Sequence, residues 1–320
     1  MEAEKTRLVF FSKGDNKFIS EIIQKLGDQF EIRLITISSA AEYRLMEQWM
    51  EWAEVCWFEW CDELIAYGSK LELAEKRKIL CRLHSYEAFS NYPSKVNWNR
   101  VDKLVFVSED IRKYVIEHFK IRKDITAVIP NGVDMEKTNY SQKKPGFNVA
   151  YVGYINFKKG PMLLLHTFKA IFDADNRYRF YIAGSYQEPR YYLYFNQMLK
   201  EFGMENNLFF QGWQANIDSW LENKDYIICS SVLESQNMSV MQAMAKGIKP
   251  VIHNFVGARS IYPEKYIWNT IGQAVNMVTE SNYSSEEYRS FIQQNYSFDQ
   301  QILKIRNMLA GVTANPKNAT

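Results

Sequence analysis

The sequence lacks the cysteine and glycine patterns that mark several common classes of protein. Only 4 of its 320 residues are cysteines, and Cys56, Cys61, Cys81 and Cys229 form no C-x-x-C pair. This spacing gives no support to a disulfide framework or a zinc ribbon and favours reduced thiols. No two of the 14 glycines are spaced as the G-x-G-x-x-G and G-x4-G-K-[ST] phosphate loops require. We therefore expect neither an ATPase nor a simple dehydrogenase.

A strong charge imbalance and a long apolar run are also missing. The 39 lysines and arginines nearly balance 37 aspartates and glutamates, for a net charge of +2. Nucleic acid is therefore not an expected partner, because its backbone calls for a strongly basic protein. The apolar run at 8–11 is followed at once by Lys13 and Asp15, so it is too short for a signal peptide or a spanning helix. We expect a cytoplasmic protein, with location at the inner face of the membrane left open.

A tryptophan-rich stretch at 46–60 raises the alternative of peripheral membrane contact, because tryptophan favours the headgroup region of a bilayer. Four glutamates interleave with these tryptophans, whereas an anionic membrane attracts lysine and arginine. Trp49, Trp52 and Cys56 recur at helical spacing, which is simpler to interpret as one core-facing side of a helix. Peripheral membrane contact stays an alternative.

What the sequence does contain is ample apolar surface in a repeating pattern. Apolar residues make up 47% of the chain, and its length is roughly twice the ~150 residues of one domain. Short β-branched and aromatic runs alternate with helical patterns, which indicates α/β units built on parallel sheets. The predicted strands lie at 7–12, 31–37, 55–60, 78–83, 103–108, 125–129, 148–153, 178–184, 208–213, 226–231 and 249–254.

The polar stretch at 131–147, with two glycines and a proline, predicts a linker between two domains. We expect a Rossmann-like domain over 1–140, joined by a C-terminal helix at 297–312, and a second Rossmann-like domain over 141–296. After residue 260 the chain is predicted to be mostly helical. Two such parallel α/β domains are expected to face each other across a cleft, with ligands in the loops after the strands.

The loop after the strand at 226–231 carries the most informative polar residues. Glu234 precedes a helix that runs to Gly247, and Gln242 lies in the first turns of that helix. A helix start favours phosphate, while an adjacent carboxylate is better suited to hydroxyl groups, so the pair indicates a nucleotide sugar. The alternative is that Glu234 only starts the helix and Gln242 is solvated.

A second loop follows the strand at 148–153. It runs from Gly153 to Lys159 and Gly160 before an amphipathic helix. A lysine near a helix start opposes the helix dipole, so its placement is easier to explain if a bound anion supplies the compensating charge. The alternative is an ordinary exposed lysine.

These loops belong to a set of four motifs that resembles the GT-B glycosyltransferases of the retaining family 4. The motifs appear in the family's order and are similar to its I-P-N-G-V-D, V-G-R-L-x3-K-G, strand-end glycine and E-G-x-G-x4-E-A-M-A-x-G-x-P-V-V patterns. Here they read IPNGVD (129–134), VGYINFKKG (152–160), FFQGW (209–213) and ESQNMSVMQAMAKGIKPVI (234–252). The resemblance implies a GT-B fold.

The resemblance also implies roles for single residues. Glu234 would contact donor-sugar hydroxyls, Gln242 the ribose and Lys159 the diphosphate, with main-chain N–H groups near Asn237 and Met238. Two positions depart from the family pattern, because Gln242 replaces a second acid and Tyr154 replaces an arginine. Lys158 or Arg190 are the candidates to replace that arginine. The expected donor-binding residues are Gly153, Tyr154, Lys158, Gly184, Trp213, Asn237, Met238 and Gln242, beside the catalytic residues His84, Lys159 and Glu234.

In the amino-terminal half, His84 ends the strand at 78–83 and falls where the family often places a histidine over the donor sugar. The alternative is a histidine that only packs there. Asp173 and Asp175 resemble a metal-binding pair of another fold, but they are predicted to lie at a helix end, so no metal site is expected.

The resemblance implies a retaining, metal-independent enzyme without a cofactor. It would move a sugar from a nucleotide-diphosphate donor to a hydroxyl of a glycan, lipid-linked or protein acceptor. The alternative function is a catalytically weakened GT-B accessory subunit that binds acceptor and assists a partner enzyme. An isomerase or phosphorylase on the same fold has less support, because no further acid–base group is evident.

Overall fold

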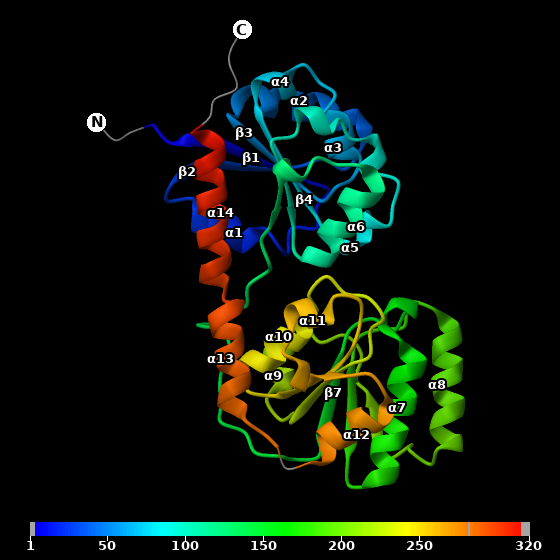
Figure 1. Cartoon of the computed structure of the whole chain (residues 1–320). Helices are drawn as coiled ribbons and strands as arrows, with labels where there is room; N and C mark the ends of the chain where they lie inside the picture. Colours follow the sequence, from blue (N-terminus) through cyan, green and yellow to red (C-terminus); the bar gives the residue numbers. More distant parts are fainter. Residues whose placement is uncertain (1–3, 281, 315–320) are drawn as a thin grey trace. The chain divides into compact units, whose positions relative to one another are not determined.

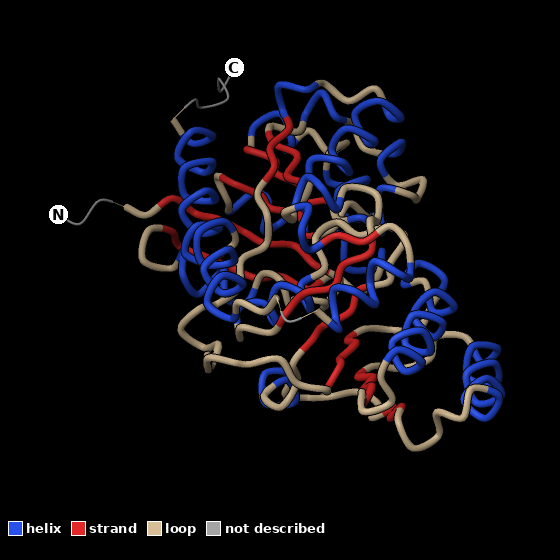
Figure 2. Tube along the Cα trace, turned by 60° about the horizontal axis from the view of Figure 1, so that its bottom comes forward, coloured by secondary structure: helices blue, strands red, loops and turns tan. Residues whose placement is uncertain are grey.

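The computed structural model describes residues 4–280 and 282–314, which form two compact units (Figure 1). The first unit comprises Met1–Pro130 with Asp299–Thr320, and the second comprises Asn131–Phe298. Each unit contains a six-stranded sheet in which every strand pair is parallel. Helices and strands alternate along the chain in both units (Figure 2). The predicted two-domain α/β class is confirmed.

The sheet of the first unit has the strand order β2-β1-β3-β4-β5-β6. Its central strands are buried on both faces, which explains why they appear in the sequence as continuous apolar runs rather than alternating ones. The strands are β1 Thr6–Ser12, β2 Phe30–Thr36, β3 Val55–Glu59, β4 Lys78–Leu83, β5 Lys103–Phe106 and β6 Thr126–Val128. The helices are α1 Ser20–Leu26, α2 Tyr43–Trp52, α3 Glu63–Gly68, α4 Leu73–Lys76, α5 Ser85–Ala88, α6 Glu109–Phe119 and the C-terminal α14 Phe298–Thr313.

The sheet of the second unit has the order β9-β8-β7-β10-β11-β12, the strand order of a Rossmann fold. Its sixth strand, β12, has only two residues and lies in the segment after residue 260, which is mostly helical, as predicted. The strands are β7 Asn148–Val152, β8 Arg179–Ala183, β9 Leu208–Phe210, β10 Tyr226–Cys229, β11 Lys249–His253 and β12 Ile267–Trp268. The helices are α7 Pro161–Ala174, α8 Pro189–Glu201, α9 Ile217–Leu221, α10 Met238–Ala245, α11 Ala258–Ile261, α12 Ile271–Thr279 and α13 Ser285–Asn295.

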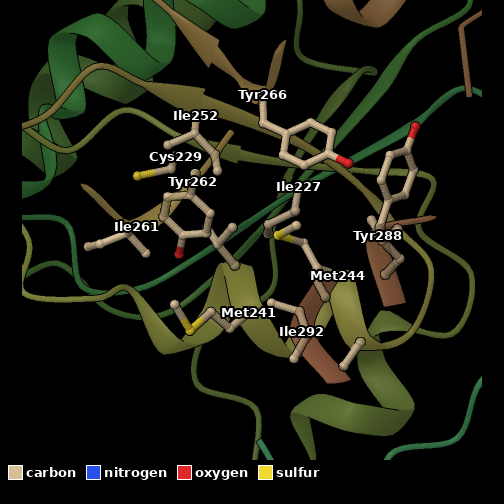
Figure 3. Close-up of a cluster of buried hydrophobic side chains, with 14 of the residues drawn as sticks. Ile227, Cys229, Met241, Met244, Ile252, Ile261, Tyr262, Tyr266, Tyr288 and Ile292 are labelled. Carbon is tan, nitrogen blue, oxygen red and sulfur yellow. The ribbon is translucent and has the colours of Figure 1, made fainter. Parts of the chain in front are cut away.

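Alternate side chains of the second sheet enter two separate cores. On one face, Ile227, Cys229 and Ile252 pack with Met241 and Met244 of α10 (Figure 3). The opposite face packs against α7 and contributes the intervening residues of the same strands. Because α10 is anchored through its buried face, the loop before it is held at a fixed place beside the sheet.

The tryptophan-rich stretch does not form the single core-facing helix that its spacing suggested. The helix α2 ends at Trp52 and Cys56 belongs to β3, so the prediction that Trp49, Trp52 and Cys56 share one helix face was wrong. Trp49 and Trp52 are half-buried, and the guanidinium carbons of Arg7 and Arg33 lie 5.9 and 5.4 Å from the ring centroid of Trp52. Among the described residues, no helix combines the length and the apolar character that crossing a bilayer requires.

Candidate functional site

The strand order of the second unit marks one place at its sheet edge for a ligand. The order reverses between β7 and β10, since β8 and β9 extend to one side and β11 and β12 to the other. Open parallel sheets bind ligands outside the carboxyl ends of their strands at such a reversal. The loops at 153–160 and 230–237 follow these two strands, and they are the loops that the sequence motifs singled out.

Backbone contacts join the two loops closely. The N–H of Val232 donates to the carbonyl of Lys158 at 2.9 Å, and the Ser230 hydroxyl donates to the carbonyl of Lys159 at 2.8 Å. Gly160 has φ +60°, and a Cβ there would lie 2.2 Å from the Ser230 carbonyl oxygen. Only glycine fits this approach, which explains the Lys-Gly pair before α7.

The buried Glu234 and two partly buried lysines form a charge cluster between these loops. The Lys159 ammonium forms an ion pair with Oε1 of Glu234, and the Ser231 hydroxyl donates to the same oxygen at 2.8 Å. Lys158 Nζ lies 3.7 Å from the other carboxylate oxygen. Burial alone would raise the pKa of Glu234, but Lys159, Lys158 and Ser231 outweigh it and hold that pKa below its usual range. Glu234 therefore stays a carboxylate at neutral pH.

The position of Lys159 near a helix start predicted a bound anion as its compensating charge, and in the structure Glu234 supplies that charge. Of the two cations considered as replacements for the missing arginine, Lys158 lies beside Glu234, whereas Arg190 forms an exposed ion pair with Glu188 at 2.8 Å. A ligand diphosphate would thus meet two lysines that already share one carboxylate.

The helix α10 begins with a residue in an unusual conformation. Asn237 has φ 55° and ψ 76°, and its Oδ1 accepts from the N–H of Val240 at 3.4 Å. This position corresponds to a glycine of the family motif, and asparagine is among the few other residues that adopt left-handed backbone readily. Asn237 thus satisfies the N–H of Val240, whereas the N–H groups of Met238 and Ser239 have no partner within the helix and favour an anion.

Gln236, which was not among the predicted site residues, holds the loop at 230–237 in place. Gln236 accepts from the N–H of Asn131 at 2.7 Å and donates to the carbonyl of Asn131 at 2.6 Å. The Tyr262 hydroxyl donates to the Gln236 carbonyl at 2.7 Å. These groups are buried, so the loop that carries Glu234 has a defined position. No signal in the sequence could have revealed a contact between residues so far apart.

Gln242 lies one helical turn beyond Met238 and is half-buried. Its side-chain amide forms no hydrogen bond with another residue in the described part of the chain, so both its oxygen and its N–H groups are available to a ligand.

Beyond the charge cluster, glycines bring the ends of β7, β8 and β9 together. The N–H of Gly184 donates to the Gly212 carbonyl at 2.8 Å, and a Cβ on Gly184 would lie 1.9 Å from the Gly153 carbonyl oxygen. The rings of Tyr154 and Trp213 stack there with centroids 5.8 Å apart. Trp213 is 70% exposed, which leaves an aromatic surface open beside the charge cluster.

In the first unit, His84 follows β4 directly and is packed between two rings. The centroids of Trp60 and Phe18 lie 4.3 and 5.2 Å from that of His84. His84 Nε2 lies 3.0 Å from Oε1 of Glu59, which is fully buried. Burial lowers the pKa of His84 more than the carboxylate raises it, so the imidazole is neutral at neutral pH.

Two further carboxyl groups lie at this edge of the first sheet. Burial raises the pKa of Glu87 to about 8 and that of Asp62 to about 7. Oε1 of Glu87 accepts from the N–H of Cys61 at 3.0 Å, while its buried Oε2 has no hydrogen-bond partner among the residues that the structure describes. Among the described residues, no three histidine, cysteine or acidic side chains are arranged to hold a metal ion. The metal-independence of the reaction stays a prediction.

Comparison with known families identifies the class to which this arrangement belongs. The family model "Glycosyltransferase Family 4" matches residues 44–137, and the model "Glycosyl transferases group 1" matches residues 134–271. The chain therefore carries a domain of glycosyltransferase family 4 followed by a group 1 glycosyltransferase domain, and the two models together cover residues 44–271. The family resemblance of the sequence motifs is confirmed.

Individual relatives are distant. An uncharacterized glycosyltransferase of Methanocaldococcus jannaschii, MJ1059, is 21% identical over 169 residues, which are 49% of this chain and 41% of that protein. The chain thus matches less than half the length of this curated relative. Among solved structures, Anabaena Alr3699/HepE in complex with UDP has a TM-score of 0.78 at 15% identity and covers 96% of this chain with 100% of its own. Staphylococcus aureus TarM has a TM-score of 0.66 at 16% identity over 79% of this chain and 55% of its own.

Proposed function

We propose that the protein transfers a sugar from a nucleotide-diphosphate donor to a hydroxyl acceptor, with retention of configuration and without a metal ion. The observation that carries this proposal is the cluster of Lys159, Lys158 and Glu234 at the strand-order reversal beside the start of α10. Two cations and free helix N–H groups suit a diphosphate, while the carboxylate suits sugar hydroxyls.

In the proposed reaction, the bond between the sugar C1 and the diphosphate oxygen breaks while the acceptor oxygen forms a bond to C1 on the same face. The acceptor proton passes to an oxygen of the departing phosphate. Lys159 and Lys158 stabilise the negative charge that develops on the diphosphate, a contribution that is usually the largest in catalysis. Glu234 orients the sugar, and Gln242 holds the ribose through its free amide.

The known neighbours support a uridine diphosphate sugar as the donor and a glycan as the acceptor. Structures of HepE contain UDP and UDP-glucose, and a TarM structure contains UDP and α-GlcNAc-glycerol. UDP-glucose is therefore the first donor to test with this protein.

The test combines binding and turnover. Thermal unfolding is measured with UDP, GDP and ADP, because a ligand at about 100 times its dissociation constant stabilises a protein by roughly 2.7 kcal/mol. UDP release from UDP-glucose is then measured for wild type and for Lys159→Ala, which should lose at least ~100-fold in turnover through loss of charge stabilisation. A Lys159→Ala variant that releases UDP at the wild-type rate would refute the site assignment.

A second candidate function is a weakened GT-B subunit that binds acceptor and assists a partner enzyme. The observation that favours it is Tyr154, which stands where the family has an arginine and stacks on Trp213. Slow release of UDP from UDP-glucose without acceptor favours the enzyme. Absence of a thermal shift with every nucleotide favours the accessory subunit.

A further inference from the structure

Glu59 is a buried carboxylate that contacts His84. It ends β3, is 1% exposed and lies one strand away from His84, which follows the neighbouring β4. Its Oε1 lies 3.0 Å from His84 Nε2, and its Oε2 lies 3.1 Å from the indole nitrogen of Trp57. Arg82 Nη1 lies 3.8 Å from Oε1. A fully buried charge is costly unless it is paired. Whether the Glu59 carboxyl group is ionised therefore depends on these three neighbours.

The direction of each hydrogen bond follows from the chemistry of the partners. The Trp57 indole can only donate, so Glu59 accepts a hydrogen bond from it, while Arg82 forms an ion pair with the carboxylate. Burial would raise the pKa of Glu59, but Arg82, His84 and Trp57 outweigh it and keep that pKa low. An ionised carboxylate has no proton to give, so the hydrogen of the 3.0 Å contact belongs to Nε2 of His84.

The other ring nitrogen of His84 is then a lone-pair acceptor. Nδ1 has no hydrogen-bond partner in the described part of the chain. The charges agree with this tautomer, because Arg82 and Glu59 already form a neutral pair and a protonated His84 would add a second cation to a buried place. Packing between Trp60 and Phe18 fixes the plane of the ring.

We propose that Glu59 is a positioning residue that holds His84 as the neutral Nε2–H tautomer, so that Nδ1 accepts a hydrogen bond from a hydroxyl of the sugar substrate. The inference rests on the proposed function, which supplies a substrate that carries sugar hydroxyls. A carboxylate that fixes the tautomer of a functional histidine is a recurring arrangement in proteins. With this tautomer, Nδ1 of His84 acts as a hydrogen-bond acceptor rather than as a proton donor.

The tautomer itself is tested without any substrate. The chain has 4 histidines, and the ¹⁵N signals of His84 are assigned as those lost in His84→Gln. At pH 7.5 the wild type should show a protonated Nε2 and an unprotonated Nδ1. A proton on Nδ1, or a doubly protonated ring, would overturn the proposal. Trp57→Phe, which removes a donor to the same carboxylate, should leave this tautomer unchanged.

The functional consequence is tested with UDP-glucose. Glu59→Asp keeps the charge opposite Arg82 but withdraws the carboxylate from Nε2 by about 1.5 Å, the length of one C–C bond. We expect kcat for UDP release to fall by roughly 10- to 100-fold, because small displacements of positioned groups have effects of this size, with KM little changed. Glu59→Gln, which keeps the length and loses the charge, serves as a second variant with the same expectation.

A double-mutant cycle separates positioning from general structural support. If Glu59 acts through His84, Glu59→Asp should change kcat by less than about 2-fold in a His84→Ala background. An equal loss in both backgrounds, or no loss in the wild-type background, would overturn the proposal. Failure of the proposed function differs from either result, since the wild type would then release no UDP while the His84 tautomer remained as described.

Discussion

Glu234→Gln should change nucleotide binding and turnover in opposite directions. In the free protein, the carboxylate of Glu234 engages Lys159 and lies 3.7 Å from Lys158 Nζ. A diphosphate that binds these lysines must share them with Glu234 and is repelled by it. Glutamine keeps the shape of the side chain and can still accept from Ser231, but it removes the competing charge.

The size of the effect follows from the distances and the burial. Two unit charges about 4 Å apart interact by roughly 4 kcal/mol at an effective dielectric constant of 20. The Lys159 side chain is 16% exposed and that of Lys158 is 32% exposed, so solvent weakens this figure. We expect UDP to bind more tightly to Glu234→Gln by about 1–2 kcal/mol, or roughly 5- to 30-fold. Turnover of UDP-glucose should nevertheless fall at least ~10-fold, because the sugar loses a charged hydrogen-bond acceptor.

Calorimetry with UDP and a UDP-release assay with UDP-glucose measure the two quantities. Glu264→Gln is the matched control, because Glu264 pairs with Arg259 at 2.9 Å in the same unit but is 64% exposed. This control should leave both binding and turnover at wild-type values. Weaker UDP binding by Glu234→Gln, together with reduced turnover, would refute the competition between carboxylate and diphosphate.

The remaining predictions concern stability and the ribose contact. Because the pKa of the buried Glu87 is raised to about 8, its stabilisation is complete below pH ~4.5 and is lost as the pH rises through 8. Urea unfolding should show that wild type loses roughly 2–4 kcal/mol more than Glu87→Gln between pH 5 and 8.5; equal losses would contradict the buried acid. Gly184→Ala should destabilise the protein by about 3 kcal/mol or more, since its Cβ would lie 1.9 Å from the Gly153 carbonyl oxygen; an unchanged melting temperature would argue against that contact. Gln242→Glu should keep or improve UDP binding, and calorimetry that showed no binding would exclude the ribose contact.

Much of the fold could be predicted from the sequence because its strands are buried on both faces. The run at 8–11 and the run at 55–58 are apolar at every position, so neither could be solvated, and each appears as a strand. The two residues of β12 are too few to show a pattern against the helical segments around them. The spacing of Trp49 and Trp52 suggested a core-facing helix side, but the half-buried Trp52 is covered by two arginines instead of a core.

The site could be predicted only where its residues follow a strand within a recognisable motif. Lys159 and Glu234 were selected as site residues in this way, since each lies in a loop after a strand beside glycine or a helix start. Gln236 and Glu59 were not, because their roles depend on contacts with Asn131 and His84 that only the folded chain brings about. The role of a buried polar side chain depends on the residues that it contacts, and a single sequence does not show which residues these are.

The most direct measurement is a crystal structure of the protein with UDP. The account predicts that the diphosphate lies against the first N–H groups of α10 within hydrogen-bond distance of Lys159 Nζ, with the ribose at Gln242. UDP bound to this chain with its diphosphate away from Lys159 and from the start of α10 would contradict the account.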